Sequence, residues 1–262
     1  MLPLRFAIAS SADLRGAAFE ELRAAIVSAG GPNLAPLFLP NYVALYETVH
    51  LHVADVAWCP PLVARDLVRV AAADPIAAVM RGGAEHYYSV IVAHADASVR
   101  TLADVGHARF GWVSRLSAAG YIVPRRYLAT MGVSLAHADE RFFHTHAALA
   151  RALLARDVDV IATYAARTAT SFRLPEALRT QRILAAAGPI PGDVIVCGRR
   201  MDPPRARDLA SALLDVRIDP SGPLSELLNA SGFAPVAQDH FDPLSRWFDT
   251  SRDGAFRSFM LR

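Results

Sequence analysis

Residues 111–128 have the composition of an anion-binding helix start. They read GWVSRLSAAGYIVPRRYL: a short apolar strand ends at Val113, and the small residues 117–120 open a helix. The first backbone N–H groups of a helix lack partners within it, and the peptide dipoles make that end electropositive. Small side chains let a phosphonate, phosphate, sulfate or carboxylate approach those groups closely. The segment alone is equally compatible with Ser117 acting only as a helix cap.

No catalytic or metal-binding constellation is visible. The sequence lacks the motifs of a nucleophile elbow, a zinc protease, a P-loop and a dinucleotide-binding turn. Among its nine histidines, the pairs His50/His52 and His144/His146 would each share a strand face, but no cysteine or carboxylate lies nearby at metal-ligand spacing. We therefore predict a binding protein without metal or cofactor, not an enzyme.

Cys59 and Cys197 are the only cysteines and lie far apart in the sequence. Without a CxxC motif they are expected to be buried free thiols. A disulfide stays open as an alternative if the two strands that carry them are neighbours.

Bulk composition indicates a well-packed globular chain. Of 262 residues, 53% are hydrophobic and 20% charged, and the formal net charge of +2 gives no electrostatic case for nucleic acid or an anionic membrane. No stretch reaches the ~18 apolar residues of a membrane span. The first residues lack a signal-peptide pattern. We expect a cytoplasmic location if Met1 is the native start, and a periplasmic or cell-envelope location if the chain is trimmed.

Strands and helices alternate along the chain, which predicts an α/β fold with parallel strand pairs. Two such α/β runs of similar length are expected, with the chain crossing between them more than once and with no internal repeat. The expected strands are 4–9, 37–39, 54–58, 77–80, 87–93, 110–113, 142–144, 158–163, 183–186 and 193–196. The expected helices are 19–29, 42–50, 62–70, 101–105, 117–131, 146–156, 203–212 and 223–229.

Five segments, in order and spacing, resemble the phosphonate-binding (PhnD-like) solute-binding proteins of ABC importers over most of residues 1–235. They are ADVAWCPPL (54–62), HYYSVIVAHADASVRTLADV (86–105), FGWVSRLSAAGYIVPRRYL (110–128), THAALARALLARDVDVIATY (145–164) and GPIPGDVIVCGRRM (188–201). The resemblance implies the type 2 periplasmic-binding-protein fold, with two α/β lobes, a hinge and an inter-lobe ligand cleft. Lobe one would comprise 1–90 and 191–262, and lobe two 91–190. Lobe closure around the ligand is the mechanism that this architecture implies.

The resemblance also implies which residues surround the ligand. The anion would rest on the helix start at Ser117, Ala118 and Ala119, with His146 beside it. Tyr42 and Tyr87 would reach in from lobe one and the crossover, and Asp193 would face the ligand's other end. Each has a plainer alternative: a surface aromatic for Tyr42, a core residue for Tyr87, a helix cap for His146 and a turn residue for Asp193. Trp58 is expected to pack in the core.

Two departures from the family pattern bear on the ligand. The family's Ser-Thr-Ser-Gly is Ser-Ala-Ala-Gly at 117–120, so two hydroxyl donors, each worth ~1.5–3 kcal/mol toward a charged oxygen, are missing. Arg115 either supplies a cationic donor instead or points to solvent. Aminophosphonate binders of the family also carry a carboxylate shortly after the Val-Asp strand, where this chain has Ala165, Ala166 and Arg167. A carboxylate, another oxyanion or a small polar molecule therefore fits as well as 2-aminoethylphosphonate.

The sequence thus predicts a protein that binds a small oxyanion-bearing solute and delivers it to the permease of a phosphonate-type ABC transporter. We expect a monomer or weak dimer that binds no nucleic acid. An intracellular ligand sensor and a cofactor-biosynthesis enzyme on the same fold are the alternatives. The enzyme would need an acid/base pair, for which His146 and Asp193 are the candidates.

Overall fold

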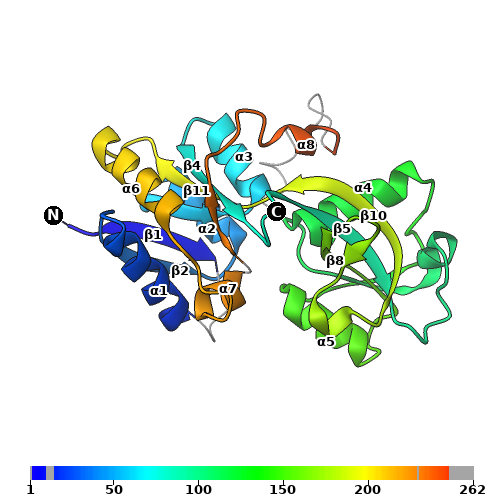
Figure 1. Cartoon of the computed structure of the whole chain (residues 1–262). Coiled ribbons are helices and arrows are strands. Elements are labelled where there is room, and N and C mark those ends of the chain that lie inside the picture. Colours follow the sequence, from blue (N-terminus) through cyan, green and yellow to red (C-terminus); the bar gives the residue numbers. More distant parts are fainter. Residues whose placement is uncertain (1, 10–14, 229, 248–262) are drawn as a thin grey trace. The chain divides into compact units, whose positions relative to one another are not determined.

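The structure is a computed structural model that describes residues 2–9, 15–228 and 230–247 (Figure 1). The described residues divide into two compact units. Unit 1 holds those up to Glu85 together with Pro191–Phe241, and unit 2 holds His86–Ile190 together with 242–247. The lobe boundaries expected from the sequence differ from this division at two places, because 86–90 and 242–247 lie in unit 2. Residues 248–262, expected in lobe one, lie outside the described residues.

Unit 1 is built on a mixed sheet with the strand order β12-β4-β11-β3-β1-β2. Strand β1 pairs in parallel with β2 and β3, whereas β11 runs antiparallel to β3 and β4. Its elements are β1 (Leu4–Ala9), α1 (Arg15–Ser28), β2 (Leu34–Leu39), α2 (Tyr42–His50), β3 (Val56–Cys59), α3 (Pro61–Arg69), β4 (Ala73–Met80), β11 (Val194–Gly198), α6 (Pro203–Asp215), α7 (Pro223–Leu228) and β12 (Gly232–Ala234).

Helices cover both faces of this sheet (Figure 1). Alternate residues of β1 point to opposite faces: Phe6 packs with Leu22 of α1 and Leu209 of α6, and Ala7 packs with Leu45 of α2. Each large apolar side chain buried in this way contributes about 1.5–3 kcal/mol. A strand that is covered on both sides needs apolar residues at successive positions, which explains the run FAIA at 6–9, while Arg5 near the start of the strand is exposed.

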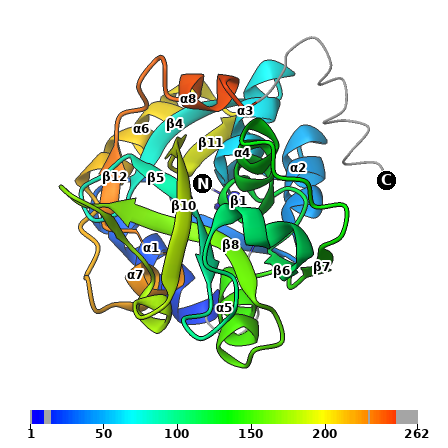
Figure 2. The ribbon, with the colours of Figure 1, turned by 90° about the vertical axis from the view of Figure 1, so that its right-hand side faces the viewer.

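Unit 2 has the strand order β10-β5-β8-β6-β7, with the short β9 paired to β8 (Figure 2). Strand β6 pairs in parallel with β7 and β8, and β5 runs antiparallel to β8. Its elements are β5 (His86–Ala93), the 3-10 turn η2 (Leu102–His107), β6 (Arg109–Trp112), the π-helical turn η3 (Ala118–Ile122), α4 (Val123–Thr130), β7 (Asp139–Phe142), α5 (His146–Leu154), β8 (Val160–Arg167), β9 (Phe172–Arg173), the 3-10 turn η4 (Glu176–Leu178), β10 (Arg182–Pro191) and α8 (Asp242–Ser245).

Strand β5 divides the core of unit 2 into two layers. Val90 packs on the side of α5, against Leu149, and Ile91 packs on the side of α4, against Leu128. All four side chains are buried. The fold therefore fixes α4 and α5 on opposite faces of one sheet, so that both helices begin near the carboxyl ends of their preceding strands.

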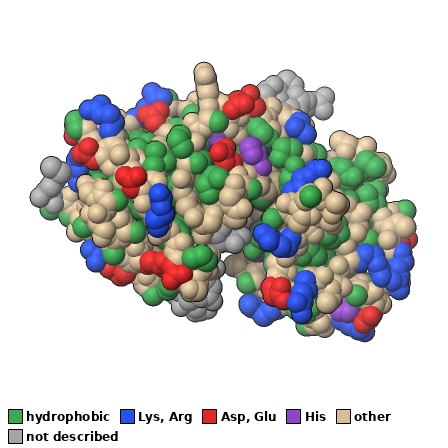
Figure 3. All heavy atoms as spheres, in the orientation of Figure 1, with side chains coloured by type: hydrophobic (Ala, Val, Ile, Leu, Met, Phe, Trp, Pro, Cys, Tyr) green, Lys and Arg blue, Asp and Glu red, His purple; other side chains and the backbone are tan. Residues whose placement is uncertain are grey.

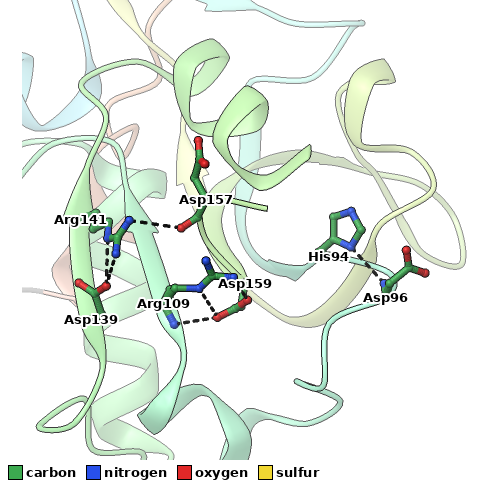
Figure 4. A network of polar contacts seen from close by, with 7 residues as sticks. All are labelled: His94, Asp96, Arg109, Asp139, Arg141, Asp157 and Asp159. Atoms are coloured by element: carbon green, nitrogen blue, oxygen red, sulfur yellow. Dashed lines mark hydrogen bonds and ion pairs between the residues drawn. The ribbon is translucent and has the colours of Figure 1, made fainter. Parts of the chain in front are cut away.

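The two units repeat one local design, which our reading of the sequence missed. Arg5 at the start of β1 pairs with Asp55 just before β3, and Arg109 at the start of β6 pairs with Asp159 just before β8, fifty residues apart in both cases. In each pair Nε donates to Oδ2 at 3.0 Å and Nη2 donates to Oδ1, at 2.8 Å and 2.6 Å respectively. Figure 4 shows the second pair. The strand orders β2-β1-β3 and β7-β6-β8 match as well, so the two units share a structural repeat that is not visible as a repeat in the sequence.

Most expected elements are present, and helix α2 has the predicted bounds, 42–50. The strand expected at 142–144 lies instead at Asp139–Phe142. His144 adopts φ 66°, a left-handed conformation that ends the extended chain before α5. The short strands β9 and β12 were not predicted, because two- and three-residue strands leave no periodic pattern.

The two cysteines lie on neighbouring strands but are free and buried. Cys59 stands opposite Val194 and Cys197 opposite Val56, so three residues of the ladder, about 10 Å, separate them. That spacing exceeds the reach of a disulfide. Burial raises the pKa of both thiols, that of Cys197 to about 11.

Two further features concern metal and membrane. No three His, Cys, Asp or Glu side chains in the described part of the chain are grouped to hold a metal ion. Within residues 2–9, 15–228 and 230–247, no helix combines the length and the apolar character of a membrane span.

The packing of η3 against β6 leads to a first prediction. A Cβ atom on Gly120 would lie 2.4 Å from Val113 Cγ2 and 2.8 Å from Ser117 Oγ. We expect Gly120→Ala to lower the free energy of unfolding by about 1–3 kcal/mol, because neither neighbour can move without disturbing the turn. Gly16→Ala on α1, where a Cβ has nothing within 4 Å, serves as the control and should be neutral or slightly stabilising. Equal thermal unfolding midpoints for both variants would contradict the packing argument.

The Arg109–Asp159 pair leads to a second prediction. Hydrogen bonds from Arg109 hold the pKa of the Asp159 carboxyl below its usual range. A carboxyl whose folded-state pKa is lowered stabilises the fold at any pH above its unfolded value, about 3.9, and loses that contribution as the pH falls through the folded-state pKa. Asp159→Asn should therefore cost about 1 kcal/mol at pH 7 and flatten the loss of stability below about pH 4.

Urea unfolding of wild type and variant at pH 7, 5, 4 and 3 measures this effect. Asp208→Asn, which alters an exposed carboxylate on α6, is the matched control. An unchanged pH dependence in the Asp159→Asn variant would show that the pair does not link protonation to stability.

Candidate functional site

Ser117 caps the helical run that follows β6. Its Oγ accepts a hydrogen bond from the Gly120 N–H at 3.0 Å, and its carbonyl accepts one from Ile122 at 3.0 Å. The run begins as the π turn η3 and continues as α4. A hydroxyl that accepts a hydrogen bond can still donate its own proton. Ser117 is thus a helix cap, a role that is compatible with donation to an anion, which stays a prediction.

The next two residues form the floor of this turn. The side chains of Ala118 and Ala119 are 6% and 2% exposed, and Ser89 Oγ of β5 donates to the Ala119 carbonyl at 2.8 Å. The first turn of a helix directs its backbone N–H groups away from the helix body, toward its N-terminal end. With methyl groups as the only side chains here, the donors at this point belong to the backbone.

His146 is the first residue of α5, and its ring is held from one side. Nδ1 is 2.9 Å from Thr163 Oγ1 on β8, and the Tyr164 ring meets the imidazole edge-on at 4.9 Å between centroids. Thr145, not His146, caps the helix, because its hydroxyl accepts from the Ala148 N–H at 3.0 Å. The predicted capping role for His146 is therefore wrong, and the Thr163 contact instead sets the orientation of its ring.

Backbone hydrogen bonds join the two loops that carry Ser117 and His146. The Val113 N–H donates to the Gly120 carbonyl at 3.1 Å, and the His144 N–H donates to the Val113 carbonyl at 2.7 Å. Both loops are thus anchored on one residue at the carboxyl end of β6. The start of each helix is fixed relative to the other within unit 2.

In unit 1, Tyr42 occupies the position that corresponds to His146. It is the first residue of α2, and Asn41 caps that helix by accepting from the Ala44 N–H at 2.9 Å, as Thr145 does for α5. The offset from Tyr42 to His146 equals that from Arg5 to Arg109, 104 residues. Tyr42 is half-buried and packs beside the cluster that contains Cys59, so the surface alternative is wrong.

Asp193 belongs to a network of polar side chains in unit 1. Its Oδ2 accepts from Arg81 Nη2 at 2.7 Å and from Trp58 Nε1 at 3.0 Å. Its backbone carbonyl accepts from the Val79 N–H at 2.8 Å. Burial, together with the nearby Asp193 charge, raises the pKa of Tyr42 to about 12, and Arg81 opposes this shift. Asp193 is therefore a paired carboxylate on a fixed backbone.

The sequence did not predict the role of Arg81, and it predicted only the packing of Trp58, not its hydrogen bond. Trp58 is 3% exposed and packs against Phe233, as predicted, but its ring N–H also binds Asp193. The signal for Arg81 was the following Gly82-Gly83, a typical two-residue hairpin turn that fixes the residue before it.

Tyr87 and Arg115 are the remaining candidates in unit 2. Tyr87 is half-buried on β5. Its neighbour Tyr88 meets the Phe172 ring at 5.2 Å, and the Arg167 guanidinium lies 5.6 Å from the Tyr88 ring. Arg115 lies over the Phe142 ring at 5.2 Å. Arg115 is exposed as well, so the structure agrees with the expectation of a solvent-facing cation, and its role as an anion donor stays a prediction.

The candidate residues fall into two groups by unit. Ser117, Ala118, Ala119, His146 and Tyr87 lie in unit 2, and Tyr42 and Asp193 lie in unit 1. On the face shown in Figure 3, cationic and anionic side chains of unit 1 are interspersed. Local pairs such as Arg81–Asp193, rather than a broad field, therefore set the electrostatics around these residues.

Solved structures with the same fold include several solute-binding proteins. PhnD1 from Prochlorococcus marinus in complex with methylphosphonate matches with a TM-score of 0.74 and 15% identity, over 93% of this chain and 96% of that one. A binding protein component of an ABC phosphonate transporter from Pseudomonas aeruginosa matches with a TM-score of 0.73 and 19% identity, over 99% and 95%. A Xanthomonas citri protein bound to ATP matches with a TM-score of 0.70 and 16% identity, over 93% and 94%. These similarities confirm the type 2 periplasmic-binding-protein fold.

No curated protein sequence matches the chain significantly. A family model does match residues 7–241, and its description is ABC transporter, phosphonate, periplasmic substrate-binding protein. The match covers most of the chain and includes all the candidate residues named above. The resemblance seen in the five sequence segments is therefore confirmed, and the chain belongs to the phosphonate-binding family of periplasmic substrate-binding proteins of ABC transporters.

Proposed function

We propose that this protein binds a small oxyanion-bearing solute, a phosphonate, a phosphate-like anion or a carboxylate. The observation that supports the proposal is that two helical segments of unit 2 begin side by side. Ser117 precedes η3 and His146 begins α5, and backbone hydrogen bonds join both loops to Val113 at the end of β6. Carboxyl ends of parallel strands with helix starts beside them are the usual ligand edge of an α/β sheet. Family membership supports a solute-binding role for the protein as a whole.

The oxyanion is held by the first turn of η3 and by His146. Backbone N–H groups at Ala118 and Ala119 supply donors, and the Ser117 hydroxyl supplies a further one. The Thr163 contact at Nδ1 keeps the imidazole in one orientation, so that Nε2 is the nitrogen presented to the anion. Because two side-chain hydroxyls of the family pattern are missing, backbone donors carry most of the binding.

Tyr42, Tyr87 and Asp193 contact the rest of the solute. The Tyr42 phenol has its pKa raised to about 12 and stays neutral at physiological pH, so it offers a hydroxyl donor and acceptor without charge. Tyr87 lies on β5 at the start of unit 2 and offers a second phenol to the solute. Asp193, on the return crossover, lies at the end away from the anion.

The partner is the permease of an ABC importer, and the place of action is the periplasm. The family description, which names a periplasmic substrate-binding protein of an ABC transporter, supports both. Membership of a transporter family favours this role over an intracellular sensor and over an enzyme. All seven candidate residues come from one chain, so binding needs no second copy. A monomer or weak dimer is sufficient.

An anion screen tests the proposal. We expect methylphosphonate, phosphate, phosphite, sulfate or acetate to raise the thermal unfolding midpoint of the full chain, with the responding anion then measured by titration calorimetry. Ser117→Asp should weaken that binding at least about 100-fold, because it adds a like charge at the anion position. His146→Ala should weaken it about tenfold through the loss of one hydrogen bond to a charged oxygen.

Ser98→Asp is the matched control, since it adds the same charge at an exposed position of unit 2. It should leave the affinity unchanged. If no anion shifts the midpoint, or if Ser117→Asp binds as the control does, the proposed anion site is wrong.

A further inference from the structure

Arg81 is held rigidly at the end of β4. Its N–H donates to the Ala84 carbonyl at 3.0 Å, and the Ala84 N–H donates back to the Arg81 carbonyl at 3.2 Å. Between them Gly82 and Gly83 have φ values of 57° and 79°, the left-handed pair that a tight two-residue hairpin requires. The turn therefore fixes the position of the Arg81 backbone, from which the side chain extends.

Asp193 is held equally firmly on the facing segment. The neighbouring Gly192 donates its N–H to the Glu85 carbonyl at 2.7 Å, and a Cβ there would lie 2.8 Å from the Val79 carbonyl oxygen. The Asp193 carbonyl is itself bound by the Val79 N–H. Two hydrogen-bonded backbone segments, at 81–84 and at 192–193, thus hold the Arg81 guanidinium and the Asp193 carboxylate together in the absence of a solute.

The pair is shielded from water more than the Arg199–Asp74 pair of the same unit. The Arg81 and Asp193 side chains are 22% and 17% exposed, whereas those of Arg199 and Asp74 are each 51% exposed. Partial burial weakens solvent screening and makes the Arg81 charge effective against the carboxylate. Trp58 binds the same Oδ2 atom, so the oxygen already has two donors.

The charge at this position is consequently balanced. A solute cation that approached Asp193 would meet the positive Arg81 beside it and would have to compete with two hydrogen bonds to Oδ2. The adjacent Tyr42 hydroxyl is neutral at physiological pH. An uncharged solute tail binds here without an electrostatic penalty, because Arg81 and Asp193 stay paired with each other and neither charge is left buried without a partner.

We propose that Arg81 is a specificity-determining residue: by neutralising Asp193, it makes the protein select solutes whose end away from the oxyanion is uncharged, and reject those with an ammonium group there. The inference rests on the proposed function, in which Asp193 faces that end of the solute. It narrows the ligand to the class of oxyanions with a neutral tail.

The test compares isosteric solutes that differ only in this charge. The head group is the one that responds in the anion screen: propylphosphonate against 2-aminoethylphosphonate, or butyrate against 3-aminopropionate. Calorimetric Kd ratios for the full chain should favour the neutral solute about tenfold or more in the wild type. Arg81→Gln should move the ratio at least tenfold toward the ammonium solute, and adding Asp193→Asn to that variant should reverse the gain.

Two variants control the experiment. Arg81→Lys keeps the charge and should keep the wild-type preference, and Arg199→Gln removes an exposed arginine paired to Asp74 and should change nothing. Equal affinity for both solutes in the wild type, or a ratio that Arg81→Gln moves less than twofold, overturns the inference while leaving anion binding intact. A response to inorganic anions alone also overturns it, since no tail is then bound. A protein that binds no anion at all refutes the proposed function itself.

Discussion

The bidentate ion pair at the start of each parallel strand pair sets the register on which the candidate site depends. Arg5 with Asp55 and Arg109 with Asp159 each bind through two side-chain hydrogen bonds and two backbone ones. A slip of one residue would turn every side chain of a strand to the opposite face. Because the pairs fix the amino ends of the strands, they also fix where the carboxyl ends stop and the helices begin.

The positions of Tyr42 and His146 follow from that register. Each is the first residue of a helix, α2 after β2 in unit 1 and α5 after β7 in unit 2, behind a capping Asn41 or Thr145. The repeat explains how one α/β design presents a polar aromatic ring at the same place in both units. The rings differ in what holds them: Thr163 binds the imidazole, while the tyrosine ring packs beside Cys59.

Charge is then distributed by pairs rather than by an overall field. The candidate anion donors of unit 2 are mostly backbone groups and carry no compensating acid in the first turn of η3. In unit 1 the candidate residue with a charge is Asp193, and it forms an ion pair with Arg81. A protein with a net charge of only +2 can thus present one electropositive helix start and one neutral polar cluster without a basic surface.

The sequence by itself determined the alternation of strands and helices, the family and the candidate anion turn. These depend on local signals: apolar periodicity, the small residues 117–120 and five ordered segments. Only the tertiary structure decided the partners of those residues, because hydrogen bonds such as Trp58–Asp193 and Arg81–Asp193 join positions 135 and 112 residues apart. It also revealed that the two units share a strand order and an ion pair at matching positions. The local sequence pattern specifies the strands and helices. Whether the Asp193 carboxylate is neutralised depends instead on the fold, which brings the distant Arg81 side chain within 3 Å of it.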